Sequence, residues 1–293
     1  MHFCNKCINT TILMRIGGAI ERPYSNPDEW YKLVKELGYR AVLSPVDFTA
    51  SKEEKKEYIE CAKKHDIVFG EVGVWKNTIA INDQERKEAI EHCINQLYLA
   101  DELAANCCVN VAGSRGKTWD GFYADNYSSD TYALIVDSIR NVIDAVKPTK
   151  TFFTLETMPW MVPDSPDQYL QLICDVERKA FGVHLDFVNM INCPKRYLFR
   201  DQFIEECFKK LGPHIKSIHG KDVIMQNAYT TLIHETMPGN GVINYQKVAR
   251  LCESLGQDTT LFVEHLPDFE AYKQAADYVR QQAALAGVRT EGK

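Results

Sequence analysis

The sequence predicts an α/β protein built as a single (β/α)8 barrel, and three observations support this prediction. Short apolar segments alternate with longer amphipathic segments, the apolar segments contain few polar residues, and the alternation repeats eight times. Such alternation predicts parallel strands joined by right-handed crossovers, and near-continuous apolar strands are buried on both faces. Eight units in 293 residues average about 37 residues each, a usual size for one closed barrel.

Each expected strand is a short apolar run bounded by residues that favour turns. The strands are predicted at 12–19, 41–46, 67–75, 107–112, 152–157, 181–187, 215–223 and 260–266. The helices that follow them are predicted at 26–38, 51–65, 83–105, 129–146, 166–178, 200–211, 245–255 and 269–285. Asn26 followed by Pro27 is typical of a helix start, and Ser51 is expected to cap the second helix.

The main alternative fold is a doubly wound open sheet. That fold favours a glycine-rich phosphate turn after the first strand, and Gly17-Gly18 does not have the G-x-G-x-x-G spacing. No linker or low-complexity stretch interrupts the chain, so we expect one domain over 1–293 with a polar N-terminal tail at 1–10. Three long polar stretches, 113–128, 189–199 and 226–241, are expected to form loops at the carboxyl ends of the strands.

Composition excludes several classes of protein. Apolar residues make up 45% and charged residues 25%, which is average for a globular protein. The net charge of −6 has the wrong sign for binding nucleic acid through its phosphates. No apolar run is long enough for a membrane span, and the first residues lack the pattern of a signal peptide, so a cytoplasmic protein is expected. The ten cysteines are scattered and are expected to be free thiols; Cys4 and Cys7 form a C-x-x-C pair without a second pair at zinc-site spacing.

Chemistry-bearing residues end the last four predicted strands. They are Glu156, Asp186, His219 and Glu264. Catalytic groups in barrels of this kind lie at the carboxyl ends of strands, and three carboxylates that meet there repel one another unless a cation neutralises them. The pattern therefore predicts one divalent metal ion, with Mn²⁺ favoured by the oxygen-rich ligand set and Mg²⁺, Co²⁺ or Zn²⁺ as alternatives.

The chain resembles the xylose isomerase-like TIM-barrel superfamily of sugar phosphate isomerases and epimerases. The resemblance spans nearly the whole chain and is strongest in the segments LETMPWMVPDSP, VHLDFVNMIN, SIHGKD, PGNGVINY and FVEHL. It implies that the four strand-end residues bind the divalent metal. It further implies that Glu156 and Glu264 serve a second time, as the acid/base pair that moves a proton beside a carbonyl.

Lys221 is predicted as a third catalytic residue. It lies two residues after His219, so its ammonium is expected on the same strand face, where it could polarise a substrate oxygen or transfer a proton. A salt bridge to Asp222 or Glu235 is the alternative.

Seven further residues are candidates for binding the substrate because they lie on or directly after the later strands. They are Glu71, Trp75, Asn110, Trp160, His184, Asn189 and Glu235. Tryptophans after the strands, including Trp119, could stack on sugar rings. His184 has an alternative as a supporting or core histidine, and His265 is expected to pack outward.

Three positions differ from the ketohexose epimerases that the chain resembles. Trp160-Met161 stands where those relatives carry a second glutamate, Asn189 where they carry a histidine, and Glu235 where they carry an arginine. These differences argue against a free ketohexose as the substrate, and the exchange of arginine for glutamate argues against an anionic version of the same sugar.

The leading hypothesis is a metal-dependent isomerase or epimerase of a sugar, sugar phosphate or polyol derivative, with a carbohydrate as its partner and a homo-oligomer as a possibility. A keto-sugar dehydratase or lyase that uses the same enediolate is the first alternative. A non-catalytic sugar-binding subunit is the second. An endonuclease IV-like nuclease is disfavoured, because Trp75, Asn110 and Asn189 stand where its additional histidines would be needed.

Overall fold

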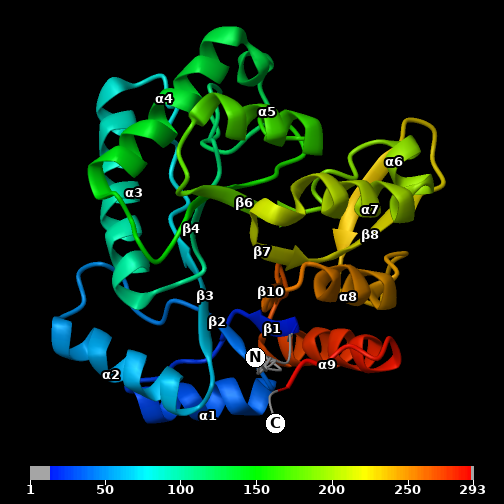
Figure 1. The fold of residues 1–293 in the computed structure, drawn as a ribbon. Helices are drawn as coiled ribbons and strands as arrows, with labels where there is room; N and C mark the ends of the chain where they lie inside the picture. Colours follow the sequence, from blue (N-terminus) through cyan, green and yellow to red (C-terminus); the bar gives the residue numbers. More distant parts are fainter. Residues whose placement is uncertain (1–13, 292–293) are drawn as a thin grey trace, which may run out of the picture.

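The computed structural model describes residues 14–291 and contains a barrel of eight parallel strands surrounded by helices (Figure 1). The strands follow the order β1, β10, β7, β6, β5, β4, β3 and β2. Their bounds are β1 (Met14–Gly18), β2 (Ala41–Leu43), β3 (Val68–Gly73), β4 (Cys107–Asn110), β5 (Phe153–Glu156), β6 (Phe181–Asp186), β7 (Ile215–Gly220) and β10 (Thr259–Val263). The edges β1 and β2 meet where Arg40 N donates to Ile16 O at 2.9 Å, so the barrel is nearly closed. The predicted (β/α)8 fold is confirmed.

The helices cover the outside of this barrel and alternate with the strands. Their bounds are α1 (Pro27–Leu37), α2 (Lys52–Lys64), α3 (Asp83–Leu103), α4 (Ser129–Val146), α5 (Pro166–Val176), α6 (Pro194–Leu198), α7 (Arg200–Leu211), α8 (Tyr245–Ser254) and α9 (Phe269–Leu285), with short 3-10 turns at Ala124–Tyr127 and Gly212–His214. The predicted caps are confirmed, since Asn26 accepts from Glu29 N and Ser51 accepts from Glu54 N. These side chains satisfy backbone donors that a helix start leaves free.

Side chains fill the interior of the barrel, so a binding site can form only at an end of the barrel. Every residue of β5 and β6 is buried, as expected for strands packed on both faces. Phe262 of β10 lies across the interior, where a Cβ atom added at Gly17 or Gly70 would come within 2.7 Å or less of its ring. The two glycines therefore make room for one large side chain, which closes the barrel below the strand ends.

The predicted strand 215–223 and the predicted loop 226–241 are both wrong in part. Strand β7 ends at Gly220, and the chain then forms an antiparallel hairpin of β8 (Asp222–Gln226) and β9 (Leu232–Thr236) outside the barrel sheet. Asp222 holds the base of this hairpin, because its carboxylate accepts from Val223 N and Ile243 N at 2.9 Å and from Gly239 N at 3.0 Å. The hairpin forms one wall of the cavity described below.

Three further expectations concern membrane spans, the cysteines and the N-terminal tail. None of the helices within residues 14–291 is both long enough and apolar enough to cross a membrane. The eight cysteines of the described region are free, as predicted. The predicted N-terminal tail and the Cys4–Cys7 pair lie outside the described residues.

Candidate metal and substrate site

The four predicted ligands meet at the carboxyl ends of four neighbouring strands. Glu156 ends β5, Asp186 ends β6, His219 lies near the end of β7, and Glu264 directly follows β10. Strand pairing places Asp186 directly beside His219 and places Phe262, two residues before Glu264, on the other side of His219. One ligand atom from each of the four side chains lies within 4.8 Å of the others, so the group could hold a metal ion.

His219 lies at the centre of this quartet. Its Nδ1 atom is 2.9 Å from Glu264 Oε2, 3.2 Å from Glu156 Oε1 and 4.0 Å from Asp186 Oδ2. The imidazole is nearly fully buried, and its Nδ1 edge faces all three carboxylates. This edge is therefore the nitrogen ligand that the site offers to a cation.

The Lys221 ammonium enters the same cluster from β7. Lys221 Nζ lies 2.8 Å from Asp186 Oδ2, 2.8 Å from Glu264 Oε1 and 3.1 Å from Glu235 Oε2. It also donates to Asn189 Oδ1 at 2.9 Å. Of the two salt bridges considered from the sequence, the one to Glu235 forms, while Asp222 points to the hairpin base. The side chain is 1% exposed, so its charge is balanced inside the protein.

Burial and mutual charge shift the pKa values of the cluster strongly. Burial raises the pKa of Asp186 to about 7, although Lys221 opposes this shift. Burial alone would lower the pKa values of His219 and Lys221, but the carboxylates around them raise both well above their ordinary values. Burial would raise the pKa of Glu264, but His219 and Lys221 hold it well below its usual range. The cluster is thus stabilised by protons on His219 and Lys221 when no other cation is bound.

The donor set fits a divalent cation. Asp186 Oδ2 and Glu264 Oε1 are buried, and among the described residues they face the Lys221 ammonium without a hydrogen bond of ordinary geometry. These oxygen atoms therefore retain capacity for a further ligand. One divalent cation together with the Lys221 ammonium would balance the charges of the three carboxylates and leave His219 neutral, the state in which imidazole binds a metal.

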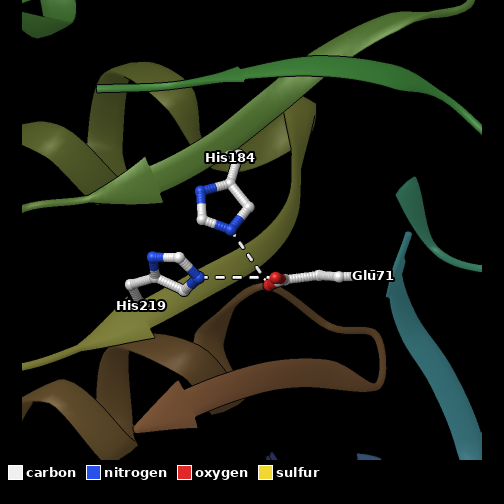
Figure 2. A group of neighbouring side chains, drawn as sticks. All are labelled: Glu71, His184 and His219. Carbon is white, nitrogen blue, oxygen red and sulfur yellow. Dashed lines mark hydrogen bonds and ion pairs between the residues drawn. The ribbon is translucent and has the colours of Figure 1, made fainter. Parts of the chain in front are cut away.

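A second buried cluster supports His219 from the opposite edge of its ring (Figure 2). His219 Nε2 lies 3.3 Å from Glu71 Oε2, and His184 Nε2 lies 2.9 Å from Glu71 Oε1. Ser217 Oγ also donates to Glu71 Oε1 at 2.5 Å. Burial would raise the pKa of Glu71, but the two histidines hold it far below its usual range. A carboxylate that accepts from the outer nitrogen of a metal-binding histidine fixes the orientation of its ring.

The candidate substrate-binding residues separate into two groups. Glu71, Asn110 and His184 are fully buried. Asn110 Oδ1 accepts from Lys76 N and its Nδ2 donates to Lys76 O, both at 2.9 Å, so this amide holds the loop after β3. The others line one cavity at the strand ends; they are Trp75, Trp160, Asn189 and Glu235.

Asn189 connects the two carboxylates nearest to it. Its backbone N donates to Asp186 Oδ1 at 2.8 Å, and its Nδ2 donates to Glu156 Oε1 at 3.1 Å. Its Oδ1 accepts from Lys221, so the side chain of Asn189 positions Glu156 and the lysine, while its backbone N–H positions Asp186.

The cavity measures about 850 Å³ and opens at the carboxyl ends of the strands. Its wall includes Glu156 and Glu264 together with His265, which was expected to pack outward. That expectation is wrong: His265 has a positive φ of 55°, and its Nδ1 lies 2.9 Å from Glu235 Oε1. The hydrogen bond to Glu235 raises the pKa of His265. The prediction of an outward orientation rests on the alternation of side chains along a strand. It is wrong because β10 ends at Val263, before His265.

The fold and the site together define a class of protein: a parallel eight-stranded barrel with a carboxylate and histidine cluster across its last four strands. The family described as "Xylose isomerase-like TIM barrel" matches residues 31–282. The chain belongs to this family, as its motifs predicted.

One curated relative matches part of the chain. It is the "Probable endonuclease 4" of Persephonella marina, 26% identical over 182 residues, which cover 59% of this chain and 61% of that protein. The match therefore spans about three fifths of the length of that relative.

Solved structures similar to the chain share its fold. D-psicose 3-epimerase from Clostridium cellulolyticum H10, solved with D-tagatose, has a TM-score of 0.69 and 14% identity, covering 94% of this chain and 100% of that one. The 3-keto-D-glucoside 4-epimerase of E. coli has a TM-score of 0.67 and 16% identity, covering 92% and 99%. A xylose isomerase-like protein from Mycobacterium smegmatis, solved with magnesium, has a TM-score of 0.67 and 16% identity, covering 94% and 98%. At these identities the likeness shows the fold alone.

Proposed function

We propose that this protein is a divalent-metal-dependent isomerase or epimerase of a sugar, sugar phosphate or polyol derivative. The observation that carries the proposal is the convergence of Glu156, Asp186, His219 and Glu264 within 4.8 Å at the mouth of a cavity. Oxygen-rich sets of this kind suit Mn²⁺ or Mg²⁺, with Co²⁺ or Zn²⁺ as further candidates.

The roles of the side chains follow from their positions. A bound divalent cation would polarise the substrate carbonyl and its neighbouring hydroxyl, and so acidify the C–H bond of the carbon that carries this hydroxyl. Glu156 and Glu264 line the cavity from strands β5 and β10, so one carboxylate is assigned to remove the proton and the other to return it. Lys221 supplies a fixed positive charge 2.8 Å from Glu264 Oε1, at one of the two carboxylates assigned to proton transfer. Asn189 holds Glu156 and Lys221 in place.

The printed names of the fold neighbours support a sugar substrate. They include D-psicose 3-epimerase and 3-keto-D-glucoside 4-epimerase, and another neighbour was solved with magnesium. Trp75 and Trp160 in the cavity wall are suitable surfaces for sugar rings.

Exchange of substrate hydrogen with solvent tests the proposal. The protein would be incubated with Mn²⁺ in D₂O and with free ketoses, ketose phosphates, 3-keto sugars and inososes, and the products would be analysed by NMR and mass spectrometry. We expect deuterium at the carbon beside the carbonyl of one substrate, with product of conserved mass apart from the label. Glu156→Gln and Glu264→Gln should reduce this exchange about 10²–10⁴-fold, while Glu91→Gln on an exposed helix position should not.

Two results would redirect or reject the proposal. A product lighter by one water would assign the dehydratase or lyase alternative, because elimination starts from the same proton removal. No exchange with any substrate and any metal, together with retained sugar binding, would favour the non-catalytic sugar-binding subunit.

The curated relative makes a nuclease the second candidate. The residues described around the cavity include no lysine or arginine, while acidic side chains surround its polar end. Phosphate backbones are bound through such cations, so this wall is unsuited to DNA. Incision of a duplex that contains an abasic site, at catalytic rates and lost in Glu156→Gln, would establish the nuclease instead.

A further inference from the structure

The cavity is larger than a free hexose. Even if each of the twelve non-hydrogen atoms took the ~30 Å³ that a water molecule occupies in the liquid, a hexose would fill roughly 360 Å³. The cavity measures about 850 Å³. A sugar bound at Glu156 and Glu264 therefore leaves more than half of the space for another part of the substrate.

The described residues of the wall offer no lysine or arginine that could bind an anionic group in that space. Glu156, Glu264, Glu235 and Asp120 belong to the wall, and no lysine or arginine is among the described residues that line it. The nearby Lys221 ammonium is 1% exposed and already faces three carboxylates. His265 is paired with Glu235. A phosphate placed there would lose its hydration without a lysine or arginine to pair with, which costs binding free energy.

The remaining wall is mostly apolar and aromatic, although Asn192, Thr231 and His234 also line it. Four loops and the β8–β9 hairpin contribute apolar side chains to it, among them Trp75, Trp119, Met158, Trp160, Ile191 and Leu232. Trp160 is 38% exposed, and it is the only exposed residue of the loop at 157–165 after β5.

Contacts between the loops fix this apolar surface in advance. Trp160 Nε1 donates to Asp120 O at 2.8 Å, and the Phe122 ring packs edge-on against Trp160 with centroids 6.3 Å apart. Asn192 Nδ2 donates to Pro159 O at 2.9 Å and joins the loops after β5 and β6. A preformed apolar surface binds a rigid apolar group at a small cost in conformational entropy.

We infer that the substrate is an uncharged glycoside, with its sugar ring at the acidic end of the cavity and a bulky apolar or aromatic aglycone against Trp160 and the surrounding apolar wall. The inference rests on the proposed function and names its substrate class. The anomeric carbon of a glycoside carries no carbonyl, so the carbonyl required for proton transfer must lie elsewhere on the ring. Oxidation of one ring alcohol to a ketone, with its two electrons and two protons passed to the electron acceptor of a separate dehydrogenase, must therefore supply the substrate.

Equilibrium binding tests the inference with the intact protein. Isothermal titration calorimetry would compare phenyl and methyl D-glucosides, in both anomeric forms, with D-glucose 6-phosphate. These unoxidised probes carry no ketone, so binding is measured without turnover. We expect the phenyl glucoside of one anomer to bind at least about tenfold more tightly than the matching methyl glucoside, and the phosphate to bind more weakly than either.

Two variants test whether Trp160 causes the tighter binding of the phenyl glucoside. Trp160→Ala should reduce the ratio of phenyl to methyl affinity to less than about threefold, because it removes the flat wall. Tyr229→Ala, at the fully exposed tip of the hairpin and outside the cavity wall, should leave the ratio unchanged. Circular dichroism would verify that both variants are folded.

Equal affinities for phenyl and methyl glucosides, tighter binding of the phosphate, or no binding of any glucoside would each overturn the inference. Its failure is distinguishable from failure of the proposed function. Hydrogen exchange on a free ketose, together with equal affinities for the phenyl and methyl glucosides, would reject the glycoside as the substrate and retain the isomerase. Tight binding of the phenyl glucoside without hydrogen exchange on any keto-glucoside would retain the glycoside as the ligand and reject the isomerase.

Discussion

Glu71 Oε2 lies 3.3 Å from His219 Nε2, at the edge of the imidazole opposite the three carboxylates of the quartet. The two residues come from β3 and β7, and each is buried. His219 can thus donate from Nε2 to Glu71 and present Nδ1 to a cation, an arrangement that fixes both its tautomer and its orientation.

Replacing Glu71 should weaken metal binding without removing a ligand. We expect Glu71→Gln to lower the affinity for Mn²⁺ about 10–100-fold, since the amide no longer accepts as a charged partner of His219. Titration calorimetry of the metal-stripped protein measures this change, with Glu91→Gln as the matched exposed control. An unchanged affinity in a folded Glu71→Gln protein would show that Glu71 does not orient His219.

Replacing Lys221 should destabilise the protein when metal is absent. The ammonium balances Asp186 and Glu264 inside the cluster, and Lys221→Met leaves these carboxylates without it. The free energy of unfolding of the metal-free protein should fall by about 3–5 kcal/mol, as for other broken buried ion pairs. Urea unfolding measures this loss.

The control for Lys221 is Lys56→Met, which removes an exposed pair with Glu60. It should change the free energy of unfolding by less than about 1 kcal/mol. Addition of Mn²⁺ should recover stability in Lys221→Met, because the cation takes over the neutralising charge. Equal stability of Lys221→Met and the parent protein would contradict the assigned charge balance.

Asp222→Ala should loosen the β8–β9 hairpin while leaving the barrel folded. The substitution removes the acceptor for the backbone N–H groups of Val223, Gly239 and Ile243. We expect the free energy of unfolding to fall by on the order of 3 kcal/mol, because buried donors lose a charged partner. Hydrogen exchange should accelerate more in 222–243 than in β5 and β6, where exchange follows the free energy of global unfolding; protection that stays the same in the hairpin would disprove its anchoring by Asp222.

Alkylation of the cysteines should follow burial. Burial raises the pKa values of Cys93 and Cys252 to about 12, so neither forms a thiolate at pH 8, whereas Cys174 is exposed. Treatment of the native protein with iodoacetamide should modify Cys174 and leave Cys93 and Cys252 intact until urea is added. Mass mapping of peptides gives the result, and rapid native modification of Cys93 would contradict the packing of α3.

The barrel and the quartet could be predicted because each depends on local pattern plus topology. An apolar run followed by a carboxylate marks the end of a buried strand, and parallel strands bring such ends together without further information. This pattern predicts Glu156 and Asp186 at the ends of two strands, and these strands, β5 and β6, are neighbours in the barrel.

Other features depend on contacts between distant residues. The run 215–223 is apolar enough for one strand, and the break after Gly220 follows from the bonds of Asp222 to Gly239 and Ile243, far along the chain. The pairing of Glu71 with His184 likewise joins residues from opposite parts of the sequence. The positive φ of His265 has no signal in its neighbours.

Anomalous diffraction from a crystal of the protein grown with Mn²⁺ tests the central claim most directly. The account predicts one strong anomalous peak per chain, within about 2.0–2.3 Å of atoms from Glu156, Asp186, His219 and Glu264. Diffraction that instead shows no peak, with Lys221 Nζ still between Asp186 and Glu264 at saturating Mn²⁺, would contradict it.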